Sequence, residues 1–366
     1  MNVTPFQIGV PQAVLDDLQD RLARTRWPGE VRGAGWDSGA NGEALRQLVT
    51  YWQEGYDWRR QEAALNRLPQ FTARVDGLEV HFVHQRSADE AAPAVLMIHG
   101  WPDSFYRFSK VLPLLQDCHV VVPSLPGFGF SEPPGEPGFG AEEMAGLLVK
   151  LMGGLGYDRF VVQGGDWGSI IADHLVSRHA GHVRALHLTD VPQWRTMPGI
   201  FDPGELTPAE RRYFRAAETW QEKEGAYKHL QSTKPQTLAY GLNDSPAGLA
   251  GWLLEKFHTW SDGRHPLGAD DFLTNATIYW ATQTIGSSVR LYREFQQARH
   301  PNPRHRAEQP TGFALFARDL LHPPRELAER FYTVTHWTEL PRGGHFAALE
   351  QPDLFAADLR AFLKTL

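Results

Sequence analysis

The chain has 366 residues, of which 42% are hydrophobic and 22% charged, and its formal net charge at pH 7 is −7. The apolar content suffices for one large core or for a core with a smaller domain, whereas the acidic balance argues against binding to nucleic acid or to an anionic membrane. The single cysteine, Cys118, excludes an internal disulfide and a cysteine-rich metal site.

The beginning of the chain does not resemble a secretory or membrane segment. Residues 1–6 lack the basic start and the apolar stretch of a signal peptide. The longest apolar runs have the length of strands, which is too short to span a bilayer. We therefore expect a cytoplasmic protein.

Helical and strand patterns alternate along the first half of the chain. Helices are expected at 12–26, 45–52, 58–68, 108–115, 142–155 and 169–178. Strands are expected at 71–75, 78–84, 94–98, 120–122, 160–162 and 183–188. The last four strands are continuous apolar runs, which are typical of parallel strands buried on both faces. The alternation predicts a doubly wound α/β fold, with a mostly parallel sheet and helices on both faces.

This alternation stops between residues 194 and 309. The stretch is mostly helical in pattern and rich in Trp and Tyr, and it ends in a basic run at 299–306 that indicates a surface connector. Strand patterns at 311–316 and 332–337 and a helical pattern at 353–363 follow. We therefore expect one α/β domain with an inserted helical cap that covers an active site; the alternative is a plain packing domain. The predicted division is an N-terminal helical segment packing on the core (1–70), the first part of the core (71–193), the cap (194–309) and the second part of the core (310–366).

The strongest local motif is Gly164-Gly165-Asp166-Trp167-Gly168-Ser169, between an expected strand and an expected helix. This is the context of a nucleophile elbow, a sharp turn in which glycines on either side relieve crowding around the nucleophile. Asp166 occupies the place where serine is usual, which disfavours a serine esterase. The alternative interpretation is that Asp166 only caps the following helix.

A second motif, His99-Gly100-Trp101-Pro102, directly follows the strand expected at 94–98. Hydrolases with a nucleophile elbow build part of their oxyanion hole at this place. We expect the backbone N–H groups of Trp101 and Trp167 to stabilise the charge that develops on an attacked carbonyl. The alternative is a simple Gly-Trp-Pro turn.

A candidate base lies near the C-terminus. His345 follows the last expected strand, where the chain order of the triad in such hydrolases places the histidine. His99, in the oxyanion turn, and His336, inside a strand pattern, are weaker candidates. Three further histidines lack the Glu of a zinc helix motif and are expected on the surface of one helix: His174, His179 and His182.

The third member of the predicted triad is a carboxylate that orients the base. Asp319 follows the strand expected at 311–316 and is the favoured candidate. Asp190 is the alternative, because it lies at the end of the strand at 183–188, where some hydrolases place this acid.

These motifs resemble those of the microsomal-type branch of the epoxide hydrolases, in the α/β-hydrolase superfamily, and the similarity covers nearly the whole chain. The resemblance also includes Pro5-Phe6, Leu15 to Arg26 with Trp27-Pro28, Leu242-Asn243-Asp244-Ser245-Pro246, Tyr279-Trp280, Pro310-Thr311-Gly312-Phe313 and Arg342-Gly343-Gly344-His345-Phe346-Ala347-Ala348. It implies an α/β-hydrolase fold and two cap tyrosines that donate hydrogen bonds to the epoxide oxygen. By local match these are Tyr227 and Tyr292, although from the sequence alone either is more typical of a packing residue.

The chain departs from the family pattern in two places. Membrane-bound animal members carry an N-terminal anchor that this chain lacks, so we expect a soluble protein. Microsomal-type members commonly have Glu as the third triad residue, where this chain has Asp319. Either carboxylate can orient a histidine, although the shorter side chain could change the rate of ester hydrolysis.

The resemblance implies an epoxide hydrolase that needs no metal or cofactor and forms a vicinal diol through an ester on Asp166. The expected substrate is a small epoxide, apolar or aryl because of the aromatic cap, and a homodimer is the default assembly. The nearest alternative is a haloalkane dehalogenase with the same aspartate nucleophile, whose halide slot could use N–H groups of residues such as Trp101. A non-catalytic binding protein with this fold is the other alternative.

Overall fold

A computed structural model of the chain describes residues 1–197, 199–264 and 267–366. Within these residues nine strands form one sheet, in the order β1-β2-β3-β5-β4-β6-β7-β8-β9. The strands are β1 (Val3–Pro5), β2 (Gln70–Val75), β3 (Leu78–Gln85), β4 (Ala94–Ile98), β5 (His119–Pro123), β6 (Phe160–Gly164), β7 (Val183–Leu188), β8 (Ala307–Arg318) and β9 (Tyr332–Gly344). Strands β1, β2, β3 and β5 pair antiparallel, and all pairs from β5 to β9 are parallel.

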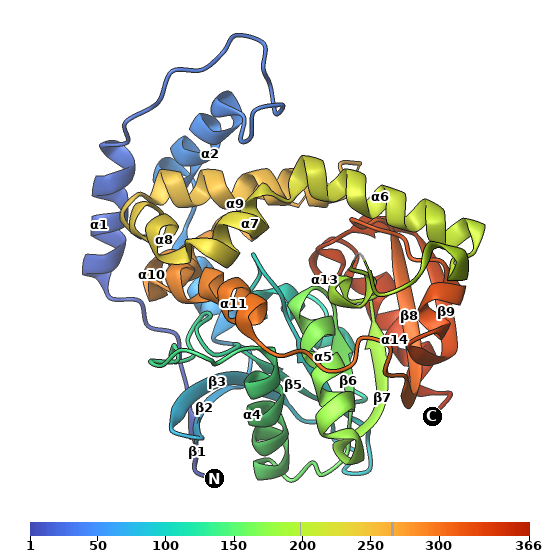
Figure 1. The fold of residues 1–366 in the computed structure, drawn as a ribbon. Coiled ribbons are helices and arrows are strands. Elements are labelled where there is room, and N and C mark those ends of the chain that lie inside the picture. The colour runs from blue at the N-terminus through green and yellow to red at the C-terminus, as the bar shows by residue number, and fades with distance from the viewer. Residues whose placement is uncertain (198, 265–266) are drawn as a thin grey trace.

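Strand β4 shows why the parallel strands lack an alternating pattern. Successive side chains of a strand point to opposite faces of the sheet. Leu96 and Ile98 belong to a buried cluster that includes residues of α4 (Ala141–Gly154) and α5 (Trp167–Arg178). Val95 and Met97 belong to a second cluster with residues of α14 (Pro352–Leu363). Helices therefore cover both faces of the sheet, so every residue in the strand centre is apolar (Figure 1).

A layer of helices lies across one end of the sheet (Figure 1). We call it the helical block, and it consists of α6 (Pro208–Glu224), α7 (Ala226–Thr233), α8 (Pro235–Asp244), α9 (Pro246–Trp260), α10 (Ala269–Thr282) and α11 (Ile285–Gln297). Strands β4 and β6 end facing this block, because residues directly after both strands contact its tyrosines. The turns after β4 and β6 therefore lie between the sheet and the block.

The N-terminal helices pack beside the helical block. They are α1 (Gln12–Ala23), α2 (Gly42–Glu54) and α3 (Trp58–Leu65), and they contact α9 and α10. Trp52 of α2 is fully buried, and its indole N–H donates a hydrogen bond to Thr277 Oγ1 of α10 at 3.1 Å. Trp58 and Leu65 of α3 belong to the same buried cluster as Val95 of the sheet.

The structure corrects three local predictions. The helix predicted at 108–115 is instead two short 3₁₀ turns, η1 (Phe105–Phe108) and η2 (Leu112–Leu114), because Pro113 has no N–H to continue a helix. The strand predicted at 332–337 extends further, because β9 pairs with β8 as far as Gly344. His174 is buried rather than exposed, since α5 packs against both α4 and the sheet, and burial lowers the pKa of His174 to about 4. His179 and His182 follow the end of α5 at Arg178 rather than lying on that helix.

A helix that crosses a bilayer needs about 20 predominantly apolar residues. Across the described ranges, none of the helices is both long enough and apolar enough to cross a membrane.

Candidate active site

Asp166 lies in a tight turn between β6 and α5. Its backbone has a φ of 55°, a left-handed conformation that is uncommon for residues other than glycine. A Cβ atom on Gly164 would collide with the backbone of Gly168, so the turn requires glycine at this position. In the described structure the Asp166 side chain caps no N–H of α5. The helix-cap alternative is therefore wrong, and the carboxylate is available for other contacts.

One oxygen of this carboxylate is held by the turn after β4. The N–H of Trp101 donates a hydrogen bond to Asp166 Oδ1 at 2.8 Å. A Cβ atom on Gly100 would overlap the Asp166 carboxylate, which explains the glycine in this motif. Trp167 begins α5, so its N–H is one of the N-terminal groups without a partner inside the helix. Its bond to a reacting oxygen stays a prediction.

The other oxygen of Asp166 faces His345. His345 Nε2 is 3.6 Å from Asp166 Oδ2, and His345 Nδ1 is 2.9 Å from Asp319 Oδ1. The structure thus brings the three residues of the predicted triad together. Asp190 makes a different contact, because its Oδ2 accepts the backbone N–H of Asp166 at 3.0 Å. The carboxylate beside the histidine is therefore Asp319, and Asp190 supports the elbow.

Charges in this group shift each other's pKa values. Burial alone would lower the pKa of His345, but the carboxylates of Asp319 and Asp166 outweigh it and raise the pKa to about 10. Burial alone would raise the pKa of Asp319, but its ion pair with His345 lowers it. Burial, and then the negative charge of Asp319, raise the pKa of Asp190 to about 7. His345 therefore lies between two carboxylates that favour its protonated form.

The two predicted tyrosines come from the helical block and lie over Asp166. Tyr227 on α7 stacks on the Trp101 ring, with centroids 5.4 Å apart, and Tyr292 on α11 meets the Trp167 ring edge-on at 4.8 Å. Their own ring centroids are 5.9 Å apart. Burial, with the nearby Asp166 charge, raises the pKa of both phenols, so both hydroxyls stay protonated and can donate hydrogen bonds.

The weaker histidine candidates make their hydrogen bonds outside this group. His99 is buried, with Nε2 accepting the Leu125 N–H at 3.1 Å and Nδ1 3.0 Å from the Gly100 carbonyl oxygen. His336 Nε2 is 2.9 Å from Asp358 Oδ1. Both therefore have structural contacts of their own.

Sequence reasoning missed the residues that fix the backbone around His345. Arg107, which is buried and paired with Asp103, donates a hydrogen bond from Nη2 to the His345 carbonyl oxygen at 2.5 Å. The Glu350 carboxylate accepts the N–H of Gly344 at 3.1 Å and that of Phe346 at 3.0 Å. No local pattern marks Arg107, whereas the closeness of Glu350 to the histidine motif is a signal that could have been used.

A cation also lies beside the tyrosines. Lys256 of α9 is 5% exposed and pairs with Glu255, and its Nζ is 4.6 Å from the ring centroid of Tyr227 and 5.6 Å from that of Trp260. An ammonium over an aromatic face is attracted by the ring, and more so when the ring gains negative charge. Lys256 therefore lies where it would stabilise negative charge that develops on the Tyr227 ring.

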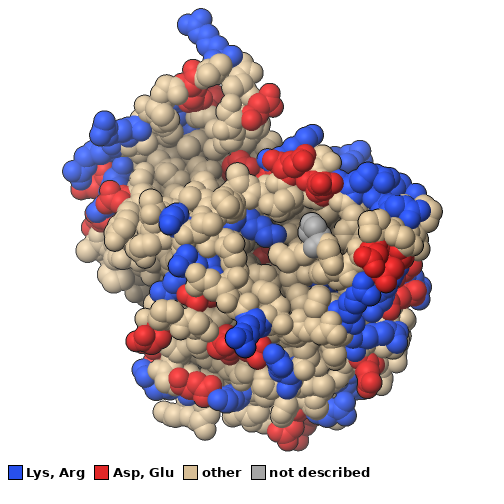
Figure 2. All heavy atoms as spheres, in the orientation of Figure 1, with Lys and Arg blue, Asp and Glu red and all other residues tan. Residues whose placement is uncertain are grey.

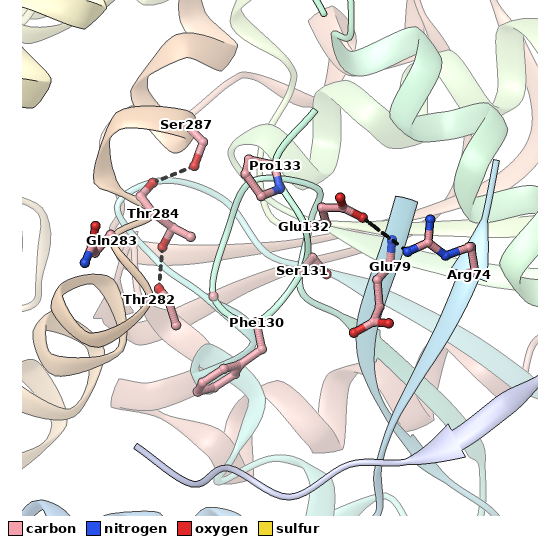
Figure 3. Close-up of a pocket in the computed structure, with 11 residues that line it drawn as sticks. Arg74, Glu79, Phe130, Ser131, Glu132, Pro133, Thr282, Gln283, Thr284 and Ser287 are labelled. Carbon is pink, nitrogen blue, oxygen red and sulfur yellow. Dashed lines mark hydrogen bonds and ion pairs between the residues drawn. The ribbon is translucent and has the colours of Figure 1, made fainter. Parts of the chain in front are cut away.

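Two open cavities lie near this group or apart from it. One, of about 470 Å³, is lined by strand and loop residues and the α10–α11 junction, and Figure 3 shows Glu132 beside Arg74 there. None of the proposed catalytic residues lines it. The other, of about 560 Å³, lies beside α6 and reaches Asp319, with Arg215 and Lys223 also in its lining. Figure 2 shows basic side chains gathered near α6, and mixed charges elsewhere on that face.

Comparison with known proteins identifies the family. Residues 3–108 match the epoxide hydrolase N terminus family, and residues 93–222 match the α/β-hydrolase fold family. Epoxide hydrolase 1 of Sus scrofa is 34% identical over 100% of this chain and 89% of its own length. A Stigmatella aurantiaca protein, named provisionally as an epoxide hydrolase, is 40% identical over 100% of this chain and 85% of its own length.

The structural comparison agrees with the sequence matches. The solved structure of the Aspergillus niger epoxide hydrolase superposes with a TM-score of 0.90 at 31% identity, over 100% of this chain and 97% of that one. The predicted fold class and the predicted family resemblance are confirmed. The chain belongs to the epoxide hydrolase family, whose members are hydrolases built on the α/β-hydrolase fold.

Proposed function

We propose that the chain converts a small-molecule epoxide and water to a vicinal diol through a covalent ester on Asp166. The observation that supports this most directly is the setting of the Asp166 carboxylate. One oxygen accepts the Trp101 N–H at 2.8 Å, and the other is 3.6 Å from His345 Nε2. A carboxylate suits an epoxide, because attack on the strained carbon gives an ester that water can cleave.

In the first step an Asp166 oxygen forms a bond to one epoxide carbon while the carbon–oxygen bond of the ring breaks. Tyr227 and Tyr292 donate hydrogen bonds to the ring oxygen, and one phenol passes its proton to it. An alkoxide is a stronger base than a phenolate, so the transfer is favourable even from a phenol whose pKa is raised. Without these donors a bare alkoxide would have to leave.

Ester formation prepares the second step. It removes the negative charge of Asp166, one of the two carboxylates that raise the pKa of His345. His345 can then give up its proton, which restores the phenol, and act as a base oriented by Asp319. It takes a proton from water as the hydroxyl attacks the Asp166 carbonyl. The N–H groups of Trp101 and Trp167 stabilise the oxyanion.

Collapse of this intermediate breaks the bond between the acyl carbon and the substrate oxygen. The released oxygen takes the proton from His345, which completes the diol. The remaining water proton, left on the Asp166 carboxyl, passes to His345 and restores the resting ion pairs. All atoms balance with one water consumed.

The helical block acts as a cap in this proposal. The tyrosines of α7 and α11 reach the nucleophile from it, and three indole rings surround them, those of Trp101, Trp167 and Trp260. Such walls suit an epoxide with an apolar or aryl body beside the ring.

One observation favours a second candidate function, haloalkane dehalogenation. Among the described residues, the indole nitrogens of Trp101 and Trp260 are buried without a hydrogen-bond partner. Two such donors beside an aspartate nucleophile could hold a departing halide. The paired phenols have no role in that reaction, so the epoxide remains the better-supported substrate.

A paired assay separates these functions. Wild type and Asp166→Asn are each given styrene oxide and, separately, a bromoalkane, and diol and bromide are measured. Mass spectrometry confirms that the Asn variant has not deamidated. Diol from wild type alone supports the proposal. Bromide without diol would support the dehalogenase. If neither product forms, even with a broad panel of epoxides, the remaining interpretation is a non-catalytic binding protein.

A further inference from the structure

Lys228 reaches from the helical block toward the nucleophile. It follows Tyr227 on α7, and its Nζ donates a hydrogen bond to Gln193 Oε1 at 2.8 Å. Gln193 begins the short turn η4 (Gln193–Thr196), three residues after Asp190, whose carboxylate accepts the Asp166 N–H. The ammonium therefore lies on the side of the core where the elbow is found.

The electrostatic setting of Lys228 agrees with this placement. Burial lowers the pKa of Lys228, and the one charged group that opposes this effect is Asp166. Lys228, Gln193 and Asp166 all keep partial solvent exposure, and the Asp166 side chain is 17% exposed. Neither the carboxylate nor the ammonium is sealed from solvent, so both are open to a ligand.

Lys228 differs from the buried basic residues in having no carboxylate of its own. Arg107 pairs with Asp103, Arg195 with Asp173 and Lys256 with Glu255. In the ranges that the structure describes, no carboxylate oxygen lies within 4 Å of Lys228 Nζ.

An ammonium has three donors, and a neutral amide oxygen satisfies only one of them. A desolvated charge without an opposite charge is costly, which makes a bound anion a natural partner. The Gln193 side-chain amide also has N–H donors available, since its oxygen is the atom that contacts Lys228. Together the two side chains offer several donors to one carboxylate.

We propose that Lys228, with Gln193, binds a carboxylate of the substrate, and that the chain prefers epoxides that carry an acidic group. This inference rests on the proposed function and narrows it. The epoxide ring would lie between Asp166 and the two phenols, the apolar body along the indole rings, and the carboxylate at Lys228.

A matched pair of substrates tests the preference. One is 4-oxiranylbenzoate, and the other is 4-methylstyrene oxide, which has a methyl group in place of the carboxylate. The kcat/KM for diol formation is measured with wild type and with Lys228→Met, which keeps much of the side-chain length without the charge. Lys234→Met is the control, because Lys234 is an exposed lysine at the end of the same helix.

Wild type is expected to favour the benzoate over the methyl compound by about tenfold or more, mainly through KM, as a charge-assisted hydrogen bond would give. Lys228→Met should lower that ratio about 10- to 100-fold. Lys228→Arg should largely keep it, and Lys234→Met should leave it unchanged. Thermal melting of each variant shows that it is folded.

Several results would overturn this inference. One is a wild type that makes diol from the methyl compound but shows no preference for the benzoate. Another is Lys228→Met losing activity equally on both substrates, which would give Lys228 a general role in catalysis or folding. Failure of the proposed function looks different, because wild type would then make diol from neither substrate and Asp166→Asn would change nothing.

Discussion

Removal of one phenol at a time tests how the ring oxygen is stabilised. We expect Tyr227→Phe and Tyr292→Phe each to remove one hydrogen bond to an oxygen that gains negative charge as the ring opens. A hydrogen bond to a charged group contributes about 1.5–3 kcal/mol, which corresponds to a loss of about 10- to 150-fold in rate. The double variant should lose far more than either single variant, because no donor then remains.

The assay is a single-turnover reaction followed by fluorescence. The rings of Trp101 and Trp167 pack against the two tyrosines and lie beside Asp166, so ester formation should change their emission. The fluorescence phase that reports ester formation should slow in Tyr227→Phe and in Tyr292→Phe, whereas the later ester hydrolysis should change little.

A third tyrosine provides a control for burial. Tyr213 is 5% exposed, close to 6% for Tyr227 and 5% for Tyr292, but it lies on α6. Tyr213→Phe should leave the ester-forming phase at the wild-type rate. If Tyr227→Phe and Tyr292→Phe also kept that rate, the result would refute a role of the phenols in stabilising the ring oxygen.

Three further predictions concern charge and space around the nucleophile. The folded-state pKa of His345 is raised from 6.5 to about 10, so its contribution to stability is full below about pH 6.5 and lost as pH rises through about 10. Between about pH 6.5 and 10 the free energy of unfolding in urea should therefore fall more for wild type than for His345→Gln. Equal decreases in the two proteins would contradict stabilisation by the ion pairs of His345. Gly100→Ala should slow ester formation about 100-fold, because the added methyl group displaces the Asp166 carboxylate, while the melting temperature stays near that of wild type. An unchanged rate would contradict the close approach of Gly100 to this carboxylate. Lys256→Met should slow ring opening about 5- to 30-fold, because the cation near Tyr227 is lost, whereas Lys256→Arg should keep the wild-type rate. If the two variants opened the ring at the same rate, an effect of the charge would be excluded.

The parts of the fold that follow local rules could be predicted from the sequence. The run Gly164 to Ser169 specifies its turn by glycines that the backbone requires, so both the elbow and Asp166 were identifiable. The apolar runs of the parallel strands were also readable, because burial on both faces leaves no polar positions. The 3₁₀ turns around Pro113 were misread, since apolar spacing outweighed the proline in that prediction.

Residues whose importance depends on distant contacts could not be predicted in this way. Arg107 contacts His345 across 238 positions of sequence, and Lys228 meets Gln193 across 35. Nothing near either residue in the chain indicates these contacts. The triad acid could be predicted only in part. The sequence offers both Asp319 and Asp190, because both follow strands, and only the folded chain shows which of them lies beside the histidine.

The most direct test of the central claim is to trap the covalent ester. His345→Gln removes the base for ester hydrolysis but leaves the nucleophile in place. The variant is incubated with styrene oxide and digested, and the peptide that contains Asp166 is measured by mass spectrometry. We predict that this peptide gains the mass of one substrate molecule, at Asp166. An unmodified peptide from a variant that still turns over epoxide, or an adduct on another residue, would contradict it.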